Sequence, residues 1–246
     1  MSNSESLYGS NENTPVKPPA MGLVDQFVGV FTEPVATFKK LHAAPAWVWA
    51  LVALVLVNLV VAAVWGFKVD VEAMLRPGFE ANPNMTQAQM DQAITFMERF
   101  FPYIAIVQTL IIIPIAVLFM ALVYWLIGRG TAEAERPSYV HALSATVVPG
   151  LVMLPHSLLI IVMAFLRPVG GLTPEKLTPS SVGFFVNATN PKLHALLYAL
   201  DPFTIGGLVL GFLAFRHTMR MKTSGALACT ALAVLITLGF RILGAK

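Results

Sequence analysis

Five long apolar runs divide this chain, and charged residues almost never interrupt them. The runs lie near residues 46–66, 103–127, 142–165, 203–219 and 224–243. Each is about as long as a helix needs to cross roughly 30 Å of hydrocarbon. Charged residues make up only 12% of the chain, where a soluble domain carries about a quarter. We therefore expect an all-α integral membrane protein, a bundle of five transmembrane helices with amphipathic interfacial helices.

The sequence divides the chain into three parts. Residues 1–20 are rich in Ser, Asn and Pro and predict a disordered polar tail without the basic start or apolar core of a signal peptide. Residues 21–45 form an amphipathic interfacial lead, and residues 46–246 form the five-span membrane domain. The single cysteine, Cys229, falls inside the last run, so no disulfide framework is expected.

The distribution of Lys and Arg bears on orientation and partners. The five spans place equal numbers of Lys and Arg on the two sides of the membrane. The turns on the N-terminal side, "RGTAEAERP" and "RHTMRMK", are short and basic, whereas the connections on the other side are long and hold most of the acids. This favours a cytoplasmic N-terminus and a C-terminus outside. The net charge of +3 includes no basic block with interleaved aromatic residues, so we expect no nucleic-acid partner.

The lead shows helical periodicity. Seven apolar residues recur at three- and four-residue intervals: Val24, Phe27, Val28, Phe31, Val35, Phe38 and Leu41. This places them on one face, with Asp25, Gln26, Lys39 and Lys40 off it. Thr32 as N-cap and Pro34 in the next first turn predict two short helices that meet at an angle.

Two interpretations of the lead remain open. As a membrane-surface platform, it would turn Phe27, Phe31 and Phe38 toward lipid or the bundle and extend Lys39 and Lys40 to anionic headgroups. The alternative is that it only leads into the first span.

Short helices are also expected in the long connections. Thr86 and Gln89 have capping-box spacing before an apolar stripe, and Pro174 and Pro191 each follow a capping residue. The stretch "LYALDPFTIGGLVLG" then places Asp201 before Pro202 at the start of an apolar run. We interpret Asp201 as the helix cap of the fourth span, because its carboxylate can accept bonds from the next free amides and faces the positive end of the helix dipole.

The order of these features resembles the Yip family, the Ypt-interacting proteins, in its short bacterial form. The resemblance covers roughly residues 23–243 and rests on "VFTEPVATFKKL", on "SYVHALSATVVPGLV" in the third span and on "LLYALDPFTIGGLVLG". It implies a protein of the bacterial cytoplasmic (inner) membrane. Eukaryotic members are implied to bind Rab-type GTPases and to shape or sort membranes.

The chain departs from the eukaryotic pattern in two respects. It carries "SLYGS" at residues 6–10, where those members have an acidic, proline-bearing motif nearer the first span, and it lacks their glycine–tyrosine pairs. Rab binding is therefore carried over to no residue.

The candidate polar site inside the bilayer lies in the third span. Pro149 and Pro155 each remove a backbone hydrogen bond, and His156 and Ser157 follow the second proline. Such a kink could form a proton or ion site, or it could be structural, with His156 making one hydrogen bond.

The spans hold no acidic residue, no His/Glu metal motif and no GxSxG, so we expect neither an enzyme nor a cofactor. The favoured function is a non-enzymatic scaffold or adaptor that organises or sorts membrane proteins or lipids. The alternative is a transporter, channel or lipid-moving protein that uses the third span around His156.

Gly207 and Gly211 lie four residues apart on one face of the fourth span. Such a face lets another backbone approach closely where packing must drive helix association. We expect it to pack within the protomer, mainly against the fifth span. A homo-oligomer formed through this face is the competing interpretation.

Overall fold

The computed structural model describes residues 18–186 and 188–244, and the tail with "SLYGS" falls almost wholly outside them. The regular elements in these residues are helices, together with one isolated bridge between Ala132 and Met221. Among the described residues, four helical segments are long and apolar enough to cross a membrane: Val48–Lys68, Gln87–Thr131, Tyr139–Leu166 and Thr223–Leu243. A fifth span results if two helices bent by 60° are counted as one, so the all-α membrane fold is confirmed.

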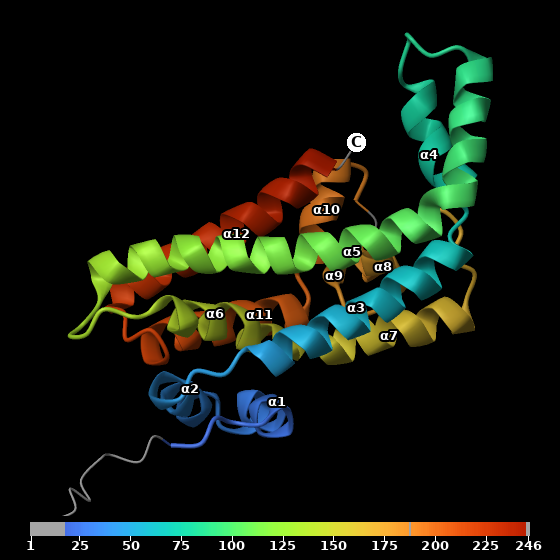
Figure 1. Ribbon diagram of the computed structural model, residues 1–246. Helices are drawn as coiled ribbons and strands as arrows, with labels where there is room; N and C mark the ends of the chain where they lie inside the picture. The colour runs from blue at the N-terminus through green and yellow to red at the C-terminus, as the bar shows by residue number, and fades with distance from the viewer. Residues whose placement is uncertain (1–17, 187, 245–246) are drawn as a thin grey trace, which may run out of the picture.

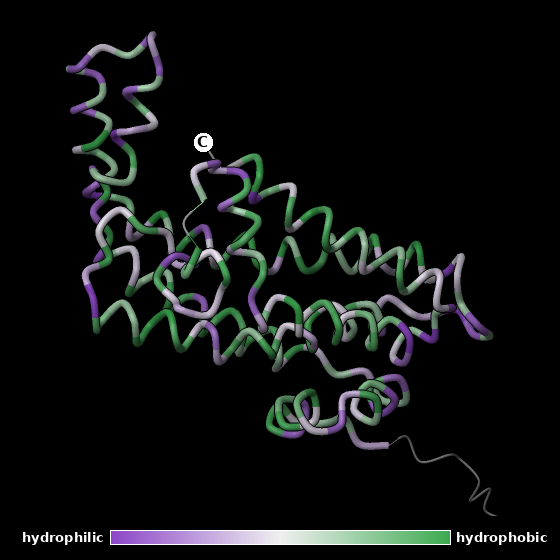
Figure 2. Tube along the Cα trace, turned by 180° about the vertical axis from the view of Figure 1, so that it is seen from behind, coloured by the Kyte–Doolittle hydropathy of each residue, from purple (hydrophilic) through white to green (hydrophobic). Residues whose placement is uncertain are grey.

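The first, second and fifth spans are α3 (Val48–Lys68), α5 (Gln87–Thr131) and α12 (Thr223–Gly244). Figure 1 shows them running across the picture, with α5 and α12 along the upper side of the bundle. Apolar residues follow these helices, while hydrophilic residues gather at the turns that join them and in the hairpin that precedes the second span, as Figure 2 shows.

The third span is interrupted. It consists of α6 (Tyr139–Val147), the 3₁₀ helix η1 (Val148–Val152) and α7 (Met153–Leu166). Pro149 stands in the first turn of η1, which follows α6 directly, so its missing N–H removes one bond to the preceding turn. Val148 and Leu151 are fully buried, so this tight segment forms part of the main hydrophobic core.

The fourth span is α11 (Pro202–His217), at 16 residues shorter than the roughly 20 that a membrane requires. The preceding α10 (Pro191–Ala199) joins it at the 60° bend. The bend falls where Pro202 begins α11 with Asp201 as its N-cap.

The connection before the second span is more helical than the sequence indicated. α4 (Val71–Glu80) was not predicted, and it packs beside the start of α5. Thr86 and Gln89 form the expected capping box, but the helix that they begin continues for 45 residues through Pro102 and Pro114. Figure 1 shows this helix changing direction, so that its first part and α4 form a hairpin that stands away from the bundle. The other long connection holds α8 (Pro174–Leu177) and α9 (Val182–Phe185).

The lead forms two helices, α1 (Leu23–Thr32) and α2 (Pro34–Ala43), as predicted. The N-cap of α2 is Glu33 rather than Thr32, because Thr32 is still the last residue of α1 and donates its hydroxyl to the Val28 carbonyl at 3.0 Å. Figure 1 views both helices nearly end-on below the bundle, so they lie crosswise to the spans. α1 packs against η1, and α2 packs against α11.

Candidate functional site

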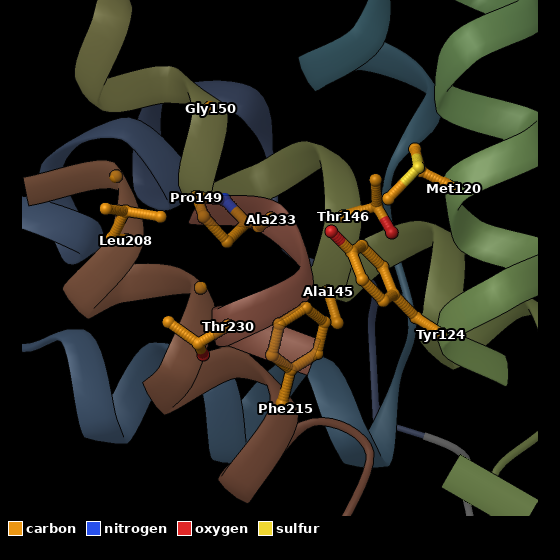
Figure 3. A pocket seen from close by; sticks show the side chains of 12 residues that line it. Met120, Tyr124, Ala145, Thr146, Pro149, Gly150, Leu208, Phe215, Thr230 and Ala233 are labelled. Atoms are coloured by element: carbon orange, nitrogen blue, oxygen red, sulfur yellow. The ribbon is translucent and has the colours of Figure 1, made fainter. Parts of the chain in front are cut away.

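A cavity of about 250 Å³ lies beside η1, between α5, α6, α11 and α12. It brings together three residues that the sequence singled out separately, namely Pro149, Gly207 and Gly211 (Figure 3). Its remaining walls are mainly apolar: Met120, Tyr124, Ala145, Thr146, Gly150, Leu208, Phe215, Thr230 and Ala233.

The two glycines explain why this space is open. A Cβ atom added to Gly207 would lie 3.6 Å from Cγ1 of Val152, and one added to Gly211 would come no closer than 4.0 Å to Phe215. Both are ordinary van der Waals distances. The glycine face therefore packs loosely against η1, and the cavity separates it from α12. Close contact of this face with the fifth span had been expected from the sequence.

Polar atoms in the cavity wall are few. The hydroxyls of Thr146 and Thr230 donate to carbonyls of their own helices, at 2.8 Å to Ala142 and 2.9 Å to Ala226. The Tyr124 ring projects from α5 toward Thr146, as Figure 3 shows. It is 5% exposed and packs against Phe215 with ring centroids 4.7 Å apart. Tyr124 was not predicted as a site residue, because its only signal in the sequence was a phenol inside an apolar run.

His156 and Ser157 are buried, but neither lines this cavity. The Nε2 atom of His156 lies 3.2 Å from Oγ1 of Thr178, and that hydroxyl lies 3.2 Å from Oγ of Ser180. Because Thr178 belongs to the segment between α8 and α9, these contacts join the third span to the long connection that follows it. Pro155, in the first turn of α7, places His156 at this junction.

Asp201 is 4% exposed and is fully engaged as a cap. Its Oδ1 accepts from the amides of Phe203 at 2.9 Å and Thr204 at 3.0 Å, and its Oδ2 accepts from the Thr204 hydroxyl. A carboxylate with these partners stabilises the start of α11, where the helix dipole is positive.

A histidine pair that the sequence did not reveal lies at the opposite end of the bundle. His42 donates from Nδ1 to the Thr218 carbonyl at 2.9 Å, and His141 donates from Nε2 to the His42 carbonyl at 3.0 Å. The Thr218 hydroxyl donates to the Phe38 carbonyl at 3.0 Å. These bonds hold the end of α2 to α6 and α11.

Basic residues gather beside this pair. Lys39, Arg216 and Arg220 line a pocket with His42 and His217, and Glu133 is its acidic member. Arg216 pairs with Glu133 at 2.5 Å and also donates to the Met221 carbonyl. The turn after α5 and the turn after α11 are therefore joined on the side where the lead docks.

The comparison with known families covers nearly all of this architecture. A family model, the Yip1 domain, matches residues 28–244, from the lead to the end of the last span. Searches of curated proteins and of solved structures gave no match. The matched residues include α2, η1 with the cavity beside it, and the capped start of α11. The chain belongs to the Yip1 domain family.

Proposed function

We propose that this protein organises membrane lipids or other membrane proteins and catalyses no reaction. The observation that carries the proposal is the lead, an amphipathic pair of helices fixed crosswise to the spans. Helices that lie in the plane of an interface add volume to one leaflet and bind in proportion to their buried apolar area.

The inner side of the lead is locked to the bundle. Phe38 and Leu41 are fully buried and belong to the main core with η1. Gln26 is 1% exposed, although the sequence placed it off the apolar face, and its amide donates to the Met21 carbonyl at 2.9 Å. A lead packed in this way moves with the spans rather than as a free tether.

The outer side of the lead is apolar and exposed. Val24 is 72% exposed, Val28 49% and Phe31 47%, and these residues form one stripe along α1. Lys39 and Lys40 on α2 are also exposed. Apolar side chains that enter the acyl region beside cations near anionic headgroups match an interfacial helix, and each such cation contributes about 1 kcal/mol.

We further propose that the lead faces the cytoplasm at the inner membrane of a bacterium. The support is the set of short basic turns after α5 and α11, which lie at the same end as α2. Partners other than the bilayer would be membrane proteins that contact this end.

The test compares two exposed phenylalanines at opposite ends of the molecule. Wild-type protein and the variants Phe31→Ser and Phe96→Ser are reconstituted in vesicles that contain phosphatidylglycerol, and vesicle diameter is measured against protein content. Phe96 is 57% exposed in the hairpin and serves as the matched control. We expect wild type and Phe96→Ser to narrow the vesicles and Phe31→Ser to lose most of that effect. Equal behaviour of all three would remove the basis of the proposal.

The interrupted third span supports a second candidate, a lipid-moving protein. η1 and the cavity beside it give the bundle a loosely packed interior. A fluorescent-lipid scrambling assay in the same vesicles separates the two, since scrambling by wild type that is lost in Gly207→Leu favours lipid movement.

A further inference from the structure

The Tyr124 hydroxyl lies at the wall of the cavity, on a side chain that is otherwise buried. The side chain is 5% exposed, and the hydroxyl makes no hydrogen bond with residues 18–186 or 188–244. It projects into the cavity beside Thr146, whose own hydroxyl already donates within α6 (Figure 3). The free donor of Tyr124 favours a ligand that offers a hydrogen-bond acceptor at this point.

The depth of Tyr124 indicates which acceptor is available. Arg129 is exposed and stacks over Trp125 with its Cζ 5.0 Å from the ring centroid, and Trp125 donates to the Pro137 carbonyl. Tryptophan and arginine in this arrangement mark a membrane interface. Tyr124 is five residues from Arg129, about 7.5 Å along the helix. Because each headgroup layer is about 5–8 Å thick, Tyr124 lies near the boundary where lipid ester carbonyls meet the hydrocarbon.

The lining of the cavity suits an acyl chain. Its walls are mainly apolar, and Gly207 and Gly211 contribute no side chain. Both glycines, Leu208 and Thr230 are partly exposed, so the cavity opens to the surface of the bundle that contacts lipid. We propose that the cavity binds one acyl chain of a diacyl phospholipid, whose ester carbonyl accepts a hydrogen bond from Tyr124. This site lies outside the lead and goes beyond the proposed membrane-organising role.

A helix of a second copy is the competing occupant, because Gly207 and Gly211 have the spacing of a dimer seam. The geometry favours the lipid. Four spans wall the cavity, and a helix with side chains is about 10 Å across, so its entry would force them apart. A single acyl chain is narrower than a helix, and it brings the acceptor that a second helix, with its carbonyls bonded internally, lacks.

The test is native mass spectrometry of the purified chain in detergent with dioleoyl phosphatidylglycerol and with its diether analogue. The two lipids share headgroup and chains, but only the first has ester carbonyls. One net hydrogen bond corresponds to a roughly two- to twelvefold change in affinity. We expect wild type to prefer the ester lipid by that factor, and Tyr124→Phe to bind both lipids at the level of the ether.

Two glycine variants complete the design. Gly207→Leu fills the cavity and should reduce the binding of both lipids, whereas Gly239→Leu, with no atom within 4 Å of an added Cβ, should bind like wild type. Equal binding of ester and ether lipids by wild type would overturn the proposal without depending on any variant. Loss of a dimer in Gly207→Leu with lipid binding unchanged would assign the cavity to a second copy.

Discussion

The bond between Thr218 and Phe38 gives a direct measure of how firmly the lead is held. Thr218 is fully buried, and Thr218→Val replaces its hydroxyl by a methyl group of nearly the same shape. The Phe38 carbonyl lies inside α2, where the amide of His42 remains as a second donor. No buried acceptor is therefore left unpaired, and the cost is the net value of one hydrogen bond, about 0.5–1.5 kcal/mol.

That cost corresponds to a roughly two- to twelvefold increase in the open population of α2. Hydrogen–deuterium exchange in nanodiscs should show the increase at the amides of residues 38–43, because local opening governs their exchange. Thr230→Val is the matched control, since the Thr230 hydroxyl donates within α12 at 2.9 Å and does not contact the lead. Unchanged exchange in the Thr218 variant, or the same increase in both variants, would refute the reasoning.

Three further changes test other contacts. Asp201→Ala removes the cap of α11 and should lower stability by about 0.5–2 kcal/mol in a thermal melt in detergent, whereas Asp201→Asn should retain most of it; equal melting of the two would contradict the capping role. Gly225→Ala should destabilise by about 1–3 kcal/mol, because its Cβ would fall 2.2 Å from Oγ1 of Thr131, while Gly130→Ala enters open space and should melt like wild type. His156→Ala should open the α8–α9 segment to limited proteolysis by removing the bond to Thr178, and His156→Gln should preserve protection; equal cleavage of the two would show that this bond does not hold the segment.

The spans could be predicted because hydrocarbon thickness and flanking charges fix their lengths. The run at 46–66 became Val48–Lys68, and the run at 224–243 became Thr223–Gly244. The continuity of α5 could not be predicted in this way, because a proline such as Pro102 can either end a helix or kink it. α4 packs beside α5, and Arg76 pairs with Glu72 at 2.6 Å and with Asp91 at 3.4 Å. The pair with Asp91 stabilises the hairpin but forms only after the two helices have met, so the local sequence does not reveal it.

The cavity shows a similar limit. Pro149, Gly207 and Gly211 each stand out locally, as helix breakers or small residues in apolar runs. Their meeting point depends on how η1 packs against α11, and Tyr124 enters from a third helix. Spacing along one helix predicts which residues share a face, but not which helix that face meets. An added Cβ at Gly207 therefore meets Val152 of η1, and one at Gly211 meets only Phe215 of its own helix, rather than α12.

The lead shows why the membrane makes this limit sharper. In water, an amphipathic helix has one apolar face, and that face meets the core. Beside a bundle in lipid, both surroundings are apolar, so α1 can bury Gln26 on one side and expose Val24 on the other. On the small polar face that remains, the Gln26 amide nitrogen donates to the Met21 carbonyl, while its Oε1 is buried without a partner in the described residues. Periodicity thus identifies the helix, and specific pairs such as Thr218 with Phe38 decide which side docks on the bundle and which faces lipid.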